Sequence, residues 1–302
     1  MRNVLRGMGN MGLKSLVELQ RQIITSLFSD DELLEHLVLK GGNAVDLVHG
    51  AAQRASLDLD FSLSTDFPYD LKTMELRFRE VLERGLGEVG YAVIDVKLAQ
   101  RPESIADDLK DFWGGYELEF KLVVESDFEQ LKDNQRSLRM AAQDIGPNHR
   151  KRFRVDFSKH EFCEGKESKD IQGFRIWVYT PTMIVCEKLR AICQQMPEYK
   201  QTVRSQKARP RARDFFDIFA LIEGRSVDLD PVQTKDLLQG MFNAKRVSLS
   251  LLGRIDEHRE FHRSDFDAVK ATVKPGIDVK SFDFYVDFVV TQVARLEALW
   301  KE

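Results

Sequence analysis

The stretch that decides the fold reads Val38-Leu39-Lys40-Gly41-Gly42-Asn43, and Ser56-Leu57-Asp58-Leu59-Asp60-Phe61 follows a short helix later. Two adjacent glycines end one hydrophobic run, and two aspartates separated by one residue open a second. Side chains at positions i and i+2 of a strand point to the same face, so Asp58 and Asp60 would present paired carboxylates. Such oxygens suit Mg²⁺ or Mn²⁺, and a glycine turn lets the backbone approach a phosphate. The pattern predicts nucleotide chemistry.

The composition is that of a folded protein, with 43% hydrophobic, 10% aromatic and 31% charged residues among 302. The formal net charge is -4 at pH 7, so contact with nucleic acid would depend on local basic patches. The three cysteines, Cys163, Cys186 and Cys193, form no CxxC pair and fit no disulfide framework, which indicates a reducing cytoplasm. Nowhere are about eighteen consecutive residues apolar, so we expect no membrane partner.

The order of the periodic segments predicts an α+β fold with a mixed sheet, followed by a helical C-terminal region. Alternating or buried runs predict strands at Leu37–Leu39, Leu57–Leu63, Tyr91–Ala99, Tyr116–Val124 and Phe153–Phe157. Helical spacing covers Leu13–Phe28, Ser29–Leu37, Ala44–His49, Pro68 to about Glu88, Thr182–Gln195, the residues from Arg213 onward and Phe282–Trp300. The polar stretch Glu198–Arg213 is expected to be a loop. We place a boundary near Thr180, which gives units 1–180 and 181–302.

The spacing of glycines and aspartates favours nucleotidyl transfer. This reaction is served by two divalent ions about 4 Å apart that carboxylates bridge. Asp156 is the best candidate for a third carboxylate because it lies alone among apolar residues of a predicted strand. Gly41 and Gly42 open a helix, so their N–H groups would face the phosphates, and Asn43 is a suitable N-cap. The alternative to a nucleotide site is that Gly41-Gly42 forms an ordinary tight turn and that Asp58 only caps the end of a strand.

A second group of charged residues lies in the helical half. Lys188 interrupts an apolar helix, and Asp214 and Asp217 share a face of another helix, with Arg213 beside them. A lysine and an aspartate on neighbouring helices would form a buried ion pair that faces the metal site. Such a pair would either hold the two halves together or neutralise triphosphate charge, and the sequence favours neither role.

Four segments carry a resemblance, namely VLKGGNAV, RASLDLDFSL, EKLRAI and RARDFFDIFAL. Over roughly residues 31–225 the chain resembles the nucleotidyltransferases of the AbiEii/AbiGii toxin family. The resemblance implies a polymerase-β-like nucleotidyltransferase core and a helical C-terminal region. It also implies the toxin half of a two-gene toxin–antitoxin or phage-abortive system, with a cognate antitoxin as partner. Members with an assigned reaction use an NTP to modify the tRNA 3′ acceptor end.

Carried over by position, the resemblance assigns roles to individual residues. The expected catalytic residues are Asp58, Asp60, Asp156, Lys188 and Asp214, of which Asp58, Asp60 and Asp156 would hold the metal. The expected nucleotide-binding residues are Lys40, Gly41, Gly42, Asn43, Ser56, Arg190 and Arg213. Two positions depart from the family pattern: Asn43 replaces a small hydroxyl residue, and Arg213 stands where lysine is common.

The sequence leaves open which molecule accepts the nucleotide and what role one further motif has. Basic runs at 149–154 and 204–213 would hold an RNA backbone through charge, or would simply be solvated surface. His258 and His262, four residues apart, would bind zinc or belong to a solvated charged face. The leading hypothesis is transfer of a nucleoside monophosphate to RNA, most often tRNA in the family. The alternatives are a protein or small-molecule acceptor, or a catalytically silent nucleotide-binding module.

Overall fold

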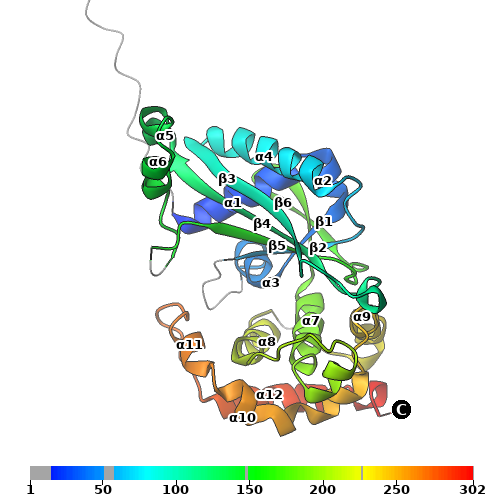
Figure 1. Cartoon of the computed structure of the whole chain (residues 1–302). Helices are drawn as coiled ribbons and strands as arrows, with labels where there is room; N and C mark the ends of the chain where they lie inside the picture. The colour runs from blue at the N-terminus through cyan, green and yellow to red at the C-terminus, as the bar shows by residue number, and fades with distance from the viewer. Residues whose placement is uncertain (1–14, 51–57, 147–148, 226, 302) are drawn as a thin grey trace, which may run out of the picture.

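A mixed sheet and a group of C-terminal helices make up the protein (Figure 1). The computed structural model describes residues 15–50, 58–146, 149–225 and 227–301. Helices α1 and α4 pack together on one side of the sheet, and the helices from α7 onward gather below it in Figure 1. The predicted α+β class, with a mixed sheet before a helical region, is confirmed.

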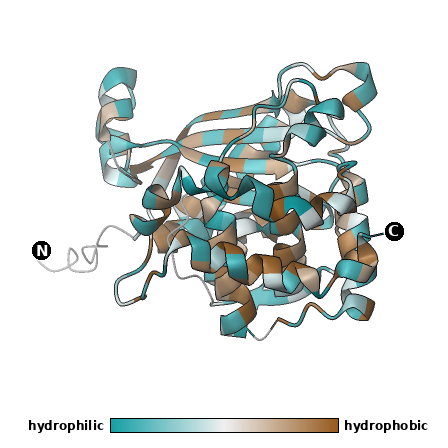
Figure 2. Cartoon of the chain, turned by 90° about the horizontal axis from the view of Figure 1, so that it is seen from below, coloured by the Kyte–Doolittle hydropathy of each residue, from teal (hydrophilic) through white to brown (hydrophobic). Residues whose placement is uncertain are grey.

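The sheet has seven strands in the order β3-β4-β5-β2-β1-β7-β6. The strands are β1 Leu37–Lys40, β2 Leu59–Leu63, β3 Tyr91–Arg101, β4 Gly115–Val124, β5 Phe153–Ser158, β6 Glu167–Ile171 and β7 Phe174–Val178. The pairs β2/β5 and β1/β7 are parallel, and the other neighbours are antiparallel. Hydrophilic and hydrophobic residues alternate along the strands (Figure 2), as expected for a sheet whose two faces differ.

The helices surround this sheet and build the C-terminal region. They are α1 Leu16–Phe28, α2 Asp31–His36, α3 Gly41–Asn43, α4 Leu71–Gly87, α5 Glu125–Leu131, α6 Gln135–Ala141, α7 Pro181–Cys193, α8 Ala212–Arg225, α9 Pro231–Ala244, α10 Arg259–Arg263, α11 Phe266–Lys270 and α12 Phe282–Ala294. A π-helical turn, Ala44–Val48, continues α3, and 3-10 turns cover Asp107–Leu109, Pro197–Gln201, Leu249–His258 and Glu297–Leu299. None of the helices in the described part of the chain is long and apolar enough to cross a bilayer.

An aromatic layer under the central strands determines which way the neighbouring polar residues point. Phe61 and Phe157 follow Asp60 and Asp156 by one residue and therefore face the opposite side of the sheet. Their rings stack at 5.6 Å, and Phe157 also stacks on Phe78 of α4 at 5.1 Å. Both phenylalanines are buried. Burial of these rings holds the two carboxylates on the face that the C-terminal helices approach.

Some local predictions differ from the structure. Asn43 is not an N-cap, because its backbone is already helical and its side chain makes no capping bond, so the helix begins earlier, at Gly41. The hairpin β6–β7 and the short helices α5 and α6 were not predicted. The last long helix, α12, ends at Ala294 and gives way to the turn Glu297–Leu299.

The boundary near Thr180 coincides with a helix start. The Thr180 side chain accepts a hydrogen bond from the Met183 N–H at 3.2 Å and caps α7. One cluster of buried apolar residues nevertheless extends from α1 to the end of α12. The division into units 1–180 and 181–302 therefore stays a prediction.

Candidate active site

Four charged residues form a row across the strands at the centre of the sheet. Lys40 of β1 pairs in register with Asp60 of β2, Asp60 pairs with Asp156 of β5, and Asp156 pairs with Glu117 of β4. Directly opposite residues on neighbouring strands lie on the same face, with their side chains close together. The register therefore brings Asp60 and Asp156 together although 96 positions separate them in sequence.

The two central carboxylates repel each other in a poorly hydrated place. Burial, then the neighbouring Asp60 and Glu117 carboxylates, raise the pKa of Asp156 to about 7. Burial is also the largest cause of the raised pKa of Asp60, which Lys40 counteracts in part. Two like charges held together in this way favour either a shared proton or a bound cation.

Gly41 brings the turn after β1 against the Asp60 carboxylate. Its φ is +67°, a left-handed conformation that glycine adopts without strain. A Cβ atom at this position would lie 2.5 Å from Asp60 Oδ2, which is closer than van der Waals contact allows. The chain thus needs a glycine here for two independent reasons.

Asn43 and Asp58 connect the glycine turn to the start of β2. The buried Asn43 amide donates a hydrogen bond from Nδ2 to the Asp58 carbonyl oxygen at 2.6 Å. The Asp58 carboxylate, 43% exposed, forms an ion pair with Arg150 at 2.5 Å. No group of three or more His, Cys, Asp or Glu side chains within the described ranges is assembled to hold a metal ion. Ser56, expected to bind nucleotide, lies outside the described residues.

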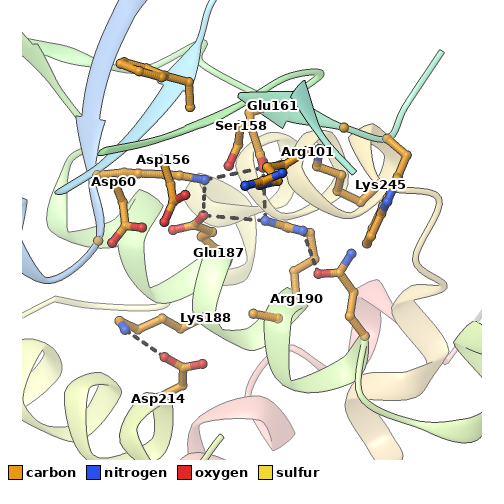
Figure 3. Close-up of a pocket in the computed structure, with 18 of the residues that line it drawn as sticks. Asp60, Arg101, Asp156, Ser158, Glu161, Glu187, Lys188, Arg190, Asp214 and Lys245 are labelled. Atoms are coloured by element: carbon orange, nitrogen blue, oxygen red, sulfur yellow. Dashed lines mark hydrogen bonds and ion pairs between the residues drawn. The ribbon is translucent and has the colours of Figure 1, made fainter. Parts of the chain in front are cut away.

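An ionic cluster adjoins this row and consists of Lys40, Glu161, Glu187, Arg190 and Lys245, whose side chains are at most 15% exposed. Figure 3 shows the last four of these residues gathered around a cavity. Lys40 Nζ lies 2.8 Å from Glu187 and 3.4 Å from Glu161. Arg190 and Lys245 also contact Glu161, at 3.3 and 3.4 Å. The cluster joins strand β1, the loop after β5, helix α7 and the end of α9. Its three cations outnumber its two carboxylates.

Burial and the excess of positive charge together determine the pKa values in the cluster. Burial lowers the pKa of Lys245 to about 8, although Glu161 acts in the opposite direction. Burial alone would raise the pKa of Glu161, but the surrounding Lys245, Lys40 and Arg190 hold it well below its usual range. Glu161 is therefore an anion at neutral pH and the common partner of the three cations.

Lys188 and two aspartates join helices α7 and α8. Lys188 Nζ lies 2.9 Å from Asp214 Oδ1 and 2.8 Å from Asp217 Oδ2, and all three side chains are buried. Arg211 approaches Asp214 at 3.4 Å. Burial would raise the pKa of Asp214, but Lys188 and Arg211 outweigh it and hold the pKa far below its usual range. The predicted buried lysine–aspartate pair between neighbouring helices is thus present.

A cavity of about 540 Å³ lies between the sheet and these helices. Asp60 and Asp156 point from the sheet toward the helices that carry Lys188 and Asp214 (Figure 3). Nine of the residues predicted from sequence line it: Lys40, Gly41, Gly42, Asp60, Asp156, Lys188, Arg190, Arg213 and Asp214. Asn43 and Asp58 do not. Arg213 is exposed on the cavity wall, where its charge acts on both Asp60 and Asp214.

Other residues of the site were not anticipated from sequence. They are Glu117, Glu161, Glu187 and Lys245, together with the cavity-lining Arg101 and Trp113. Glu187 had a visible signal, because it lies with Lys188 and Arg190 in an otherwise apolar helix. Glu161 and Lys245 are far apart in sequence and meet only in the folded chain.

Comparison with known proteins agrees with this arrangement. A family model described as "Nucleotidyl transferase AbiEii toxin, Type IV TA system" matches residues 22–288. The chain belongs to the AbiEii nucleotidyltransferase family. The match contains both the carboxylate row and the helices that carry Lys188 and Asp214. The resemblance seen in the four sequence motifs is therefore confirmed, as is the class of enzyme.

Solved structures align with this AbiEii chain at low sequence identity. JHP933 from Helicobacter pylori is 19% identical with a TM-score of 0.48, and the alignment covers 93% of this chain and 91% of that one. An antigenic nucleotidyltransferase-like protein from Paracoccidioides brasiliensis is 13% identical with a TM-score of 0.40, covering 85% and 94%. A comparison with curated proteins gave no match. The family assignment rests on the family model.

Proposed function

We propose that this AbiEii protein transfers a nucleoside monophosphate from an NTP to the 3′ end of an RNA, with tRNA as the expected acceptor, and that it acts as the toxin of a toxin–antitoxin pair. The observation that carries the proposal is the register of Asp60 with Asp156 at the wall of a cavity. The opposite wall holds the cationic side chains of α7 and α8. Carboxylates facing cations across a cavity of this size suit a metal-bound triphosphate.

The donor atoms fit a divalent ion. Asp60 and Asp156 offer hard oxygen ligands, and their raised pKa values, caused by burial and by their mutual repulsion, support a bound cation between them as an alternative to a shared proton. Asp58 would complete the set by exchanging Arg150 for the metal. Bound Mg²⁺ or Mn²⁺ would supply charge neutralisation at the α-phosphate and lower the pKa of the attacking hydroxyl.

The remaining chemistry is assigned to side chains of the cavity. The 3′-hydroxyl oxygen forms a bond to the α-phosphorus while the bond to the β-phosphate oxygen breaks, and pyrophosphate leaves. Asp156 would accept the hydroxyl proton or, alternatively, would only bind the metal. Arg213, exposed on the cavity wall, would bind the triphosphate. Lys188 already has two carboxylate partners, which supports its structural role over direct charge neutralisation.

A row of arginines beside the carboxylates supports an RNA acceptor. Arg152, which immediately precedes β5, and Arg154 of β5 lie four and two residues before Asp156 and are 53% and 43% exposed. They are held by Glu119, which is only 13% exposed, at 2.9 and 3.4 Å. Arg101 continues the row through Glu117 at 2.8 Å. The guanidinium groups thus lie outermost, where they would attract a phosphate backbone.

The alternatives make different predictions. A small-molecule acceptor needs no arginine row, and a silent binding module needs no pair of metal-binding carboxylates. The expectation of an antitoxin partner rests on the family assignment alone.

The test uses each of the four α-labelled NTPs with three acceptors: total tRNA, tRNA whose 3′-terminal diol has been oxidised with periodate, and a cell extract freed of RNA. We expect label in intact tRNA and none in oxidised tRNA. Label in protein or small molecules of the RNA-free extract would favour the second hypothesis. Tight NTP binding without transfer to any acceptor would favour the silent module.

A further inference from the structure

His262 has neither of the two roles that its spacing from His258 suggested. Its side chain is fully buried, so it is not part of a solvated charged face. The described residues contain no cluster of ligands that would make it a zinc site. Its ring packs against Phe215 of α8 at 5.3 Å between centroids. A buried histidine against the helix that carries Asp214 calls for another explanation.

His262 and Asp265 accept hydrogen bonds from the start of α8. The Arg211 N–H donates to His262 Nδ1 at 3.0 Å, and the Ala212 N–H donates to Asp265 Oδ1 at 3.1 Å. The first amides of a helix have no partner within the helix itself. Here the accepting side chains are distant in sequence: His262 lies 51 positions after Arg211, and Asp265 lies 53 positions after Ala212.

The hydrogen bond fixes the tautomer of His262. Because Nδ1 accepts a hydrogen bond, the proton of the neutral ring lies on Nε2. Burial lowers the pKa of His262 to about 4, so the ring is neutral at physiological pH. The geometry and the burial therefore both favour a permanent acceptor at Nδ1.

The turn held in this way carries much of the cavity wall. Arg211, Arg213 and Asp214 all line the cavity, and Asp214 also holds Lys188. A helix start whose first amides are tied to α10 and to the residue before α11 has little freedom to shift. We propose that His262 and Asp265 are positioning residues that hold the first turn of α8 at the distance from Asp60 and Asp156 needed for the triphosphate. This inference rests on the proposed function, which assigns the triphosphate to this wall.

The test compares variants that remove the acceptor with variants that keep it. His262→Leu and Asp265→Ala remove it, whereas His262→Asn and Asp265→Asn retain an oxygen at a similar place. We expect the KM for the preferred NTP to rise about fivefold or more in the first two, the loss that follows from one capping bond. We expect kcat to change much less, and the asparagine variants to recover most of the affinity. Asp265 is only half-buried, so its variants remain informative if His262→Leu does not fold.

A second readout does not depend on catalysis. Hydrogen exchange of the amides at 211–214 should accelerate in Asp265→Ala and return toward wild type in Asp265→Asn. Unchanged exchange and an unchanged KM in both removal variants would overturn the inference. If wild-type protein transfers no nucleotide but the exchange result is as expected, the proposed function fails while the anchoring of α8 stands.

Discussion

At the scale of single residues, packing fixes the direction in which the side chains of the site point. Asp60 and Asp156 cannot turn away from each other, because Phe61 and Phe157 are buried on the opposite face. Because Gly41 has no side chain, the Asp60 carboxylate can occupy space that the Cβ atom of any larger residue would fill. Alternation along a strand explains why Asp60 and Asp156 lie opposite the buried phenylalanines. The predicted pairing of Asp58 with Asp60 on one strand face is not seen, because β2 begins at Leu59 and Asp58 pairs with Arg150 instead.

Gly41→Ala should destabilise the protein and disturb Asp60 together. A left-handed alanine costs roughly 1–2 kcal/mol, and the added Cβ atom would in addition collide with the carboxylate. Urea unfolding should show a loss of at least about 1 kcal/mol. Gly87→Ala is the matched control, because no atom lies within 4 Å of its added Cβ. Equal stability of the two variants would contradict this account of Gly41.

Asp156→Asn should change how stability depends on pH. The folded-state pKa of about 7 lies above the ordinary aspartate value, so the folded protein binds the proton more tightly than the unfolded chain. This contribution is complete below about pH 4 and is lost as pH rises toward 7. In EDTA, wild-type protein should lose stability more steeply across this range than Asp156→Asn. Parallel curves for the two proteins would refute the raised pKa.

At the scale of elements, α7 and α8 are joined by charge rather than by apolar contact alone. Lys188 bridges Asp214 and Asp217 in a buried place, where each ion relies on the others. Replacing only one member of such a group leaves uncompensated charge, which is strongly destabilising.

Lys188→Met should therefore cost about 3–5 kcal/mol of unfolding free energy. The triple variant with Asp214→Asn and Asp217→Asn should regain much of that loss, since no buried charge remains unpaired. Lys132→Met is a suitable control, because Lys132 and Glu129 form an exposed pair whose loss should have little effect on stability. Denaturant unfolding measures all three. A small effect of Lys188→Met would mean that solvent reaches the group.

Elements with strong periodicity were predictable, and elements held by tertiary contacts were not. The strand that carries Asp156 alternates clearly, and the strands that carry Lys40 and Asp60 are short buried runs; all three lie close to their predicted positions. Strand β6, Glu167–Ile171, is largely exposed and reads as a polar loop, because an edge strand needs no apolar face. The prediction of Asn43 as a cap is wrong because the helix begins at the left-handed Gly41, three residues before the predicted start at Ala44.

At the scale of the whole molecule, charge is distributed unevenly. The chain carries a formal net charge of -4, yet exposed arginines gather next to the carboxylate row. The ionic cluster around Glu161 draws on residues from 40 to 245, so no local pattern in the sequence could indicate it. Sequence reasoning reached the carboxylates through their motifs and missed the partners that only folding brings to them.

Replacing Arg152 and Arg154 with glutamine should weaken RNA binding and flatten its salt dependence. Each lost phosphate contact reduces the log–log salt slope by about 0.7 for a single strand. The KM for NTP should stay unchanged, because these residues do not line the cavity. The double variant Lys72→Gln/Arg84→Gln, on the exposed surface of α4, removes the same charge elsewhere. If both double variants bind RNA equally weakly, the arginine row has no special part in binding.

The most direct test of nucleotidyl transfer by the carboxylate pair is the initial rate of label transfer from α-labelled NTP to tRNA, measured for wild-type protein and Asp60→Asn. Both proteins are compared at equal folded concentration with Mg²⁺ or Mn²⁺ present. We predict transfer by wild type and a loss of at least about 100-fold in Asp60→Asn, which lacks one of the carboxylates proposed to hold the metal. Transfer by Asp60→Asn at the wild-type rate would contradict the central claim.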